Sequence, residues 1–175
     1  MNKKSSPEKS RKYLTDATPV KNLKFFVEFM RQLGLGMGDV AEAAHSGEAA
    51  VRHWFLKDTI NLKKLMDVAE YYGYDLIISY DIPAPEIDRT NLTIEAPDRD
   101  YSSVDMTRRL SFIRAAMARA GVTVNQLVEK LGVTRDTAQR FFRADNISID
   151  YIYRIAEAFD WKVNITFKKK PTANS

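Results

Sequence analysis

The chain of 175 residues has no cysteine and only two histidines, His45 and His53. The absence of cysteine excludes disulfides, thiolate metal sites and a cysteine nucleophile. The two histidines have no third ligand candidate at a matching spacing, and no group of acid, base and nucleophile stands out in the sequence. We therefore expect no metal site, no cofactor and no catalytic residues, so the sequence predicts that the protein is not an enzyme.

Long apolar runs are also lacking. No stretch approaches the ~18 apolar residues that a helix needs to cross a bilayer. Residues 1–12 are charged and have no apolar segment of the kind found in secretory signals. These two absences predict a soluble protein without a membrane partner, which we expect in the cytoplasm.

Charge is distributed unevenly along the chain, although the formal net charge is only +4. Positive charge gathers in the second half and at both ends, where it would suit binding to phosphates. The basic residues among the first 12 predict either an arm that lies along a DNA backbone or a solubilising tail. The segment totals are +4 for residues 1–21 (six basic, two acidic), −3 for 22–81 (six, nine), −4 for 82–106 (two, six), +5 for 107–168 (eleven, six) and +2 for 169–175 (two, none).

The two halves of the chain align without a gap when the sequence is shifted by 87 positions. Residues 22–80 then fall on residues 109–167, and 11 of the 59 pairs are identical. Many further pairs match in apolar character, such as Val40 with Leu127. An ungapped match of this length predicts an internal duplication.

Each half shows the same succession of helical patterns. In the first half, Thr18 and Pro19 predict the start of a helix, as N-cap and first helical residue. Gly34 and Gly121 follow apolar residues at helical spacing, where glycine typically ends a helix. Further helices are expected at residues 37–44, 47–57 and 62–72, and at residues 124–131, 135–144 and 149–159.

After its helices, each half changes to an apolar period of two, which predicts a half-buried strand. Alternate residues from Tyr74 to Tyr80 and from Trp161 to Phe167 would form the apolar faces. Because a lone strand leaves its backbone groups unpaired, the two strands are expected to pair antiparallel. Pairing within the chain would give a monomer with internal pseudo-twofold symmetry, and pairing between chains would give a homodimer.

These patterns predict a mainly helical protein made of two units, each of four helices and one strand. The expected segments are a basic disordered arm (1–17), the first unit (18–81), an acidic linker with three prolines (82–105), the second unit (106–168) and a tail (169–175).

Residues 123–142 read TVNQLVEKLGVTRDTAQRFF. A capping threonine, an apolar pair in a short helix, Lys-Leu-Gly-Val at a turn and a threonine before the next helix resemble the lambda-repressor/Cro-like helix-turn-helix family. The resemblance covers roughly 120 residues as a tandem pair of units. It implies binding to double-stranded DNA, with the third helix of the unit in the major groove.

Gly132 lies between the two helices of this motif, where a sharp turn needs a positive φ. Burial of Leu127, Leu131, Ala138 and Phe141 would hold the helices together and leave the polar side chains of residues 135–143 facing outward. The resemblance places residues 135, 136, 139 and 140 at bases, and residue 143 and the start of the preceding helix at phosphates. The candidate DNA-binding residues are Thr123, Gln126, Thr134, Arg135, Asp136, Thr137, Gln139, Arg140 and Arg143, with Arg52 and His53 in the first half.

The first half departs from the family pattern. His45 replaces the turn glycine, and the outward residues of the following helix, among them Glu48 and Ala49, offer fewer hydrogen-bond donors. The family often has glutamine at the first position of the second helix, where this chain has Met37 and Val124. Two hypotheses remain open. Both halves bind one asymmetric site about one turn apart (~34 Å), with the second half dominating specificity, or the second half binds DNA while the first serves packing or a protein partner.

The resemblance predicts a sequence-specific transcriptional regulator of bacterial, plasmid or phage type. A repressor that acts by occupying its site is the most economical mechanism, since no effector domain is evident. The alternative is a protein-interaction module that keeps the helix-turn-helix scaffold without binding DNA. The acidity of the first half and Asp136 at a base-reading position favour that alternative.

Overall fold

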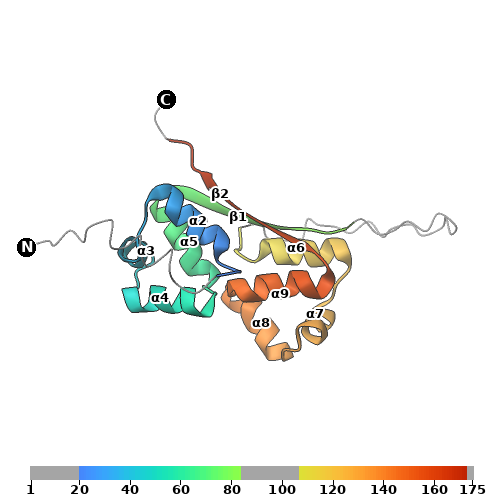
Figure 1. The fold of residues 1–175 in the computed structure, drawn as a ribbon. Helices are drawn as coiled ribbons and strands as arrows, with labels where there is room; N and C mark the ends of the chain where they lie inside the picture. Colours follow the sequence, from blue (N-terminus) through green and yellow to red (C-terminus); the bar gives the residue numbers. More distant parts are fainter. Residues whose placement is uncertain (1–19, 84–106, 173–175) are drawn as a thin grey trace, which may run out of the picture. The chain divides into compact units, whose positions relative to one another are not determined.

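The computed structural model describes residues 20–83 and 107–172. These residues form eight helices and two strands, and helices account for 58% of them (Figure 1). None of these helices has both the length and the apolar character needed to span a membrane. The first half contains α2 (Lys24–Leu33), α3 (Met37–Ala43), α4 (Glu48–Lys57), α5 (Leu62–Tyr71) and β1 (Tyr74–Asp81). The second half contains α6 (Ser111–Ala120), α7 (Val124–Leu131), α8 (Arg135–Ala144), α9 (Ile149–Phe159) and β2 (Lys162–Lys169).

The predicted helix ends agree with the observed ones to within one residue, with one exception. Helix α2 begins at Lys24, so the prediction that it begins at Pro19 is wrong. The reason is a tertiary contact: the Asp58 carboxylate accepts hydrogen bonds from the backbone N–H groups of Lys21, Asn22 and Leu23 at 2.8–3.0 Å. These bonds hold residues 21–23 in a turn before the helix starts. The proposed cap, Thr18 and Pro19, lies outside the described residues.

Helix ends in both halves fall at residues in the left-handed region of φ. Gly34 and Gly121 end the first helix of each half, as predicted. The other positions include three aspartates and a histidine, which tolerate this region better than most side chains do. The pairs, each 87 residues apart, are Gly34 (φ 66°) and Gly121 (70°), His45 (51°) and Gly132 (65°), Asp58 (53°) and Asp145 (50°), and Gly73 (79°) and Asp160 (57°).

Strands β1 and β2 pair antiparallel within the chain, forming a two-stranded sheet. The burial of β1 alternates as predicted, since residues 74, 76, 78 and 80 are the more buried set. In β2 the predicted alternation is broken at Asn164, which is half-buried like its neighbours Val163 and Ile165. Beyond the strand ends, the Lys170 N–H donates to the Gly73 carbonyl oxygen at 2.9 Å. Of the two pairings that the sequence allowed, the structure contains the one within a single chain.

Packing divides the chain into two compact units. Of the described residues, unit 1 comprises 20–77, 148–150 and 165–172, and unit 2 comprises 78–83, 107–147 and 151–164. Each unit has its own apolar core. The core of unit 1 includes Phe26, Val40, Val51 and Leu65, and that of unit 2 includes Ile113, Leu127, Ala138 and Ile152, all at most 1% exposed.

Candidate nucleic-acid interface

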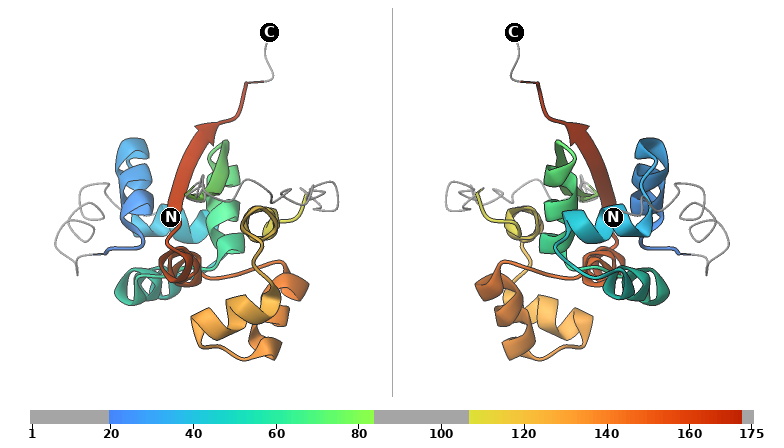
Figure 2. Two further views of the ribbon diagram at one scale, coloured as in Figure 1. Left: turned by 90° about the vertical axis from the view of Figure 1, so that its right-hand side faces the viewer. Right: turned by 90° about the vertical axis from the view of Figure 1, so that its left-hand side faces the viewer.

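Helices α7 and α8 lie next to each other in unit 2 (Figures 1 and 2). Helix α7 begins with a capping box, in which the Gln126 N–H donates to Thr123 Oγ1 (3.2 Å) and the Thr123 N–H donates to Gln126 Oε1 (2.8 Å). Two backbone donors at the helix start are thereby satisfied within the motif. The structure therefore brings Thr123 and Gln126 together, with both side chains exposed.

A three-residue turn joins the two helices. Gly132 has φ 65°, as the motif predicts, and the Val133 N–H donates to the Val128 carbonyl oxygen at 3.3 Å. A Cβ atom at Gly132 would meet nothing within 4 Å, so backbone conformation alone requires glycine there. Thr134 then caps α8 by accepting from the Thr137 N–H (3.2 Å), and their hydroxyl groups lie 2.9 Å apart.

The contact between α7 and α8 is apolar, but one of its predicted members is wrong. Leu127, Leu131 and Ala138 are buried as expected, whereas Phe141 is only half-buried and its ring lies 4.8 Å from that of Tyr151. Phe142 is the buried aromatic residue. Residues three and four positions after Ala138 both lie near its helix face, and Phe141 differs from Phe142 in packing its ring against Tyr151 of α9.

The outward face of α8 is polar and accessible, as the sequence predicted. Arg135, Asp136, Gln139, Arg140 and Arg143 are all exposed. Arg140 Nη2 lies 3.0 Å from Asp136 Oδ2, and these side chains are 70% and 68% exposed. Among the described residues, Arg135 and Arg143 have no carboxylate within ion-pair distance. The face thus presents two guanidinium groups that have no acidic partner in the described part of the chain, and a third that is paired with Asp136.

Asp145, at the end of α8, has a structural role that the sequence analysis did not predict. Asp145 accepts hydrogen bonds from the N–H groups of Arg109 (2.9 Å) and Leu110 (3.0 Å) at the start of α6. Arg109 Nε returns a bond to the Asp145 carbonyl oxygen at 2.8 Å. The available signal was the identity of Asp58 and Asp145 across the 87-residue shift, since Asp58 makes equivalent bonds in unit 1.

The matching face in unit 1 has a different chemistry. Arg52 and His53 are exposed on α4, but Arg52 Nη2 lies 3.4 Å from the carboxylate of Glu48. Glu48 precedes Arg135 by 87 residues, so an acid stands where α8 has a cation. Leu56, 65% exposed, adds an apolar side chain to the same helix. This face therefore offers little positive charge for phosphates.

Tyrosine pKa values reflect the negative potential next to α3. The carboxylate of Glu42 raises the pKa of Tyr71, whose hydroxyl lies 3.3 Å from Glu42 Oε1. Burial, reinforced by the charge of Asp39, raises the pKa of Tyr72 to about 12. The carboxylates of Glu42 and Asp39 contribute to both shifts because they disfavour a nearby phenolate, and they would also repel phosphates.

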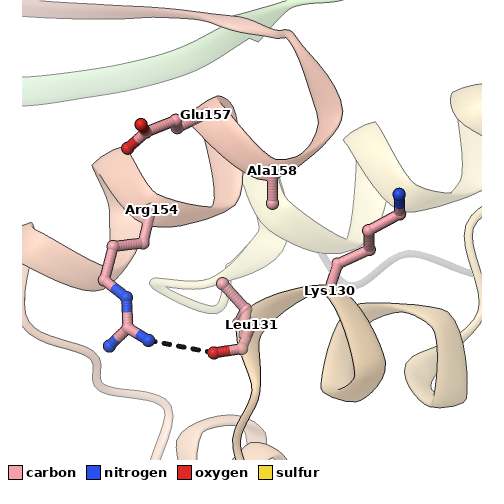
Figure 3. A pocket seen from close by; sticks show the side chains of 5 residues that line it. All are labelled: Lys130, Leu131, Arg154, Glu157 and Ala158. Atoms are coloured by element: carbon pink, nitrogen blue, oxygen red, sulfur yellow. Dashed lines mark hydrogen bonds between the residues drawn. The ribbon is translucent and has the colours of Figure 1, made fainter.

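A small open pocket in unit 2 is lined by residues of α7 and α9 (Figure 3). Its volume is about 210 Å³, and it is lined by Lys130, Leu131, Arg154, Glu157 and Ala158. Arg154 of α9 reaches to the end of α7, where its Nη2 donates to the Leu131 carbonyl oxygen at 2.9 Å. The volume is below the roughly 300 Å³ at which ligand pockets usually begin. The contact instead anchors the last turn of α7.

Among the residues that the structure describes, no group of three or more histidine, aspartate or glutamate side chains could hold a metal ion. Comparison with protein-family models gives no match. Searches against curated proteins and against solved structures likewise give no significant match.

Proposed function

We propose that the protein is a tandem helix-turn-helix regulator of the lambda-repressor/Cro-like type, which binds double-stranded DNA through α8 of unit 2. The observation that carries this proposal is the exposed polar face of α8, held by a buried contact to α7 and a glycine turn. Arginine can bind the O6 and N7 atoms of guanine with two hydrogen bonds, and glutamine can do the same with adenine. Arg135, Gln139 and Arg140 supply these groups within two turns of one helix.

In this proposal, unit 2 alone reads the bases. The start of α4 carries Glu48 at the position that corresponds to Arg135, and Asp39 and Glu42 make the adjacent surface acidic. A phosphate backbone would be repelled there, whereas the second half carries the positive charge. We therefore favour recognition of a single half-site by a monomeric chain over a site that spans both units. Regulation would follow from occupancy of the site, most simply as a cytoplasmic repressor.

The deciding experiment measures binding to a labelled random duplex as the salt concentration is raised. If unit 2 neutralises about six phosphates, affinity should fall by ~10³-fold between 50 and 200 mM salt. Selection of bound duplexes from a random pool would then define the preferred site. Binding that is absent at 50 mM salt would overturn the proposal.

Alanine variants assign the reading helix. Arg135→Ala and Arg140→Ala should each relax the preference at one base pair, by about 1–3 kcal/mol of discrimination for each lost contact. Arg52→Ala on α4 is the matched control, because Arg52 is exposed to a similar extent and also pairs with an acid one turn away. An equal effect of Arg52→Ala would mean that unit 1 reads bases too.

The second candidate is a protein-interaction module that uses the same scaffold without DNA. The pair between Asp136 and Arg140 favours it, because a carboxylate on the reading face opposes phosphates and occupies a guanidinium. Such a module would show little dependence of DNA retention on salt and no preferred sequence in the selection.

A further inference from the structure

The core of unit 2 contains a residue from the first half of the chain. Tyr80, near the end of β1, is 2% exposed, and its hydroxyl donates to the Ile152 carbonyl oxygen at 2.7 Å. Its ring centre lies 5.5 Å from that of Phe112 and 5.4 Å from that of Trp161. Its own carbonyl oxygen accepts a bond from Arg119 at 3.1 Å. All four neighbours belong to the second half.

Unit 1 contains the reverse arrangement. Phe167 of β2, from the second half, places its ring centre 3.9 Å from that of Phe29 and 6.0 Å from that of Phe25, both on α2. Three residues later, the Lys170 ammonium lies 3.7 Å from the carboxylate of Asp75. Phe167 follows Tyr80 by 87 residues, so the same position of each strand enters the unit built mainly by the other half.

A second segment of the second half also belongs to unit 1. The Ile149 N–H donates to the Ile60 carbonyl oxygen at 2.9 Å, and Thr59 Oγ1 donates to Asp150 Oδ1 at 2.7 Å. Asn61 and Ser148 form an antiparallel bridge, and they are themselves 87 residues apart. The exchange of segments is therefore not limited to the strands.

We propose that the two halves are obligatory binding partners: each supplies a strand end that completes the other's folding unit, and the covalent connection through residues 84–106 is not needed to hold them together. Neither half contains a full set of core residues for a unit. The partner that fits each half is the other half of the same chain. This proposal is independent of DNA binding, because none of the contacts on which it rests involves the exposed face of α8.

Cleavage of the folded, full-length chain tests the proposal directly. A recognition sequence for a specific protease is inserted between Ile94 and Glu95, and the purified protein is cut at a single place. The two fragments are expected to elute together in size-exclusion chromatography and to give the mass of one fragment of each kind in native mass spectrometry. Fragments that separate, or that pair only with their own kind, would overturn the proposal.

Hydrogen exchange with crossed substitutions gives a second test. Tyr80→Ala lies in the first half but should accelerate exchange at least tenfold in α6 and α9. Phe167→Ala lies in the second half but should do the same in α2. Ser79→Ala and Thr166→Ala, at exposed neighbours on the same strands, are matched controls and should leave exchange unchanged. Acceleration confined to the substituted half would refute the exchange of strand ends.

If the alanine variants unfold the whole chain, milder changes keep the test decisive. Tyr80→Phe removes only the hydroxyl bond to Ile152, and we expect a severalfold acceleration confined to α9. Phe167→Leu should act in the same way on α2. Acceleration of α5 without any change in α9 would contradict the assignment of Tyr80 to unit 2.

Discussion

Replacing Asp136 with asparagine should strengthen binding to random DNA and weaken the preference for the selected site. Asp136 lies on the exposed face of α8, with its carboxylate 3.0 Å from the Arg140 guanidinium. If α8 binds DNA as proposed, the carboxylate would repel phosphates, and it would also restrain the orientation in which Arg140 meets a base edge. Asparagine keeps the shape and removes the charge, so non-specific and specific binding should change in opposite directions.

The expected magnitudes follow from the exposure of this pair. An exposed ion pair at this helical spacing contributes only about 0.3–0.5 kcal/mol to folding, so the variant should remain folded. A carboxylate ~10 Å from a phosphate is repelled by about 0.4 kcal/mol in water. Two or three phosphates therefore give about 1 kcal/mol, or roughly a fivefold gain in affinity for random DNA at low salt. Loss of a restrained arginine should reduce discrimination at its base pair by at least about 1 kcal/mol.

Fluorescence anisotropy at 50 mM salt, with the selected duplex and a scrambled duplex in parallel, measures both changes. Glu157→Gln is the matched control, because it removes one exposed carboxylate from unit 2 on a different helix, α9. The reasoning would be refuted if Asp136→Asn left random-DNA affinity unchanged, or if it improved both duplexes by the same factor. Equal gains from both variants would reduce the role of Asp136 to net charge alone.

Three further predictions concern stability and are measured by urea denaturation. His45→Gly should stabilise the chain by about 0.5–1 kcal/mol, because glycine relieves the cost of φ 51°, whereas Gly132→Ala should destabilise it by about 1 kcal/mol; opposite signs would refute the strain argument. Asp145→Ala should cost about 2–3 kcal/mol, since two backbone N–H groups lose their acceptor, and Asp145→Asn should cost less. Burial raises the pKa of Tyr80 above its usual value near 10, so stability should fall as the pH rises above 10, and a Tyr80→Phe variant with the same alkaline loss would contradict this.

Local signals explain why most helix and strand ends could be predicted from the sequence. Gly121, Thr123 and Thr134 cap backbone groups within four residues of themselves, so the helix ends that they set can be predicted from the local sequence. The start of α2 could not be predicted from the local sequence, because it depends on hydrogen bonds to Asp58, which lies more than thirty residues away. The alternation in β1 likewise predicted a buried face but not which helices would cover Tyr80.

Some features of the candidate interface could likewise be predicted from the local sequence, and others depend on tertiary packing. The exposure of Arg135 and Arg143 follows from helical spacing, and the structure confirms it. The choice between Phe141 and Phe142 as the buried ring depends on the position of α9, which the sequence does not encode locally. The ion pair between Asp136 and Arg140 could have been predicted from the sequence, since residues four apart on a helix are neighbours. DNA binding itself remains a prediction.

The reciprocal placement of Tyr80 and Phe167 also limits how the gene can diverge. The outer surface of α4 is constrained less, because its residues Arg52, His53 and Leu56 are exposed. A deletion that removes the first half would also take Tyr80 out of the core that supports α8. Selection for a working α8 would then preserve the whole first half, even after that half had lost any activity of its own.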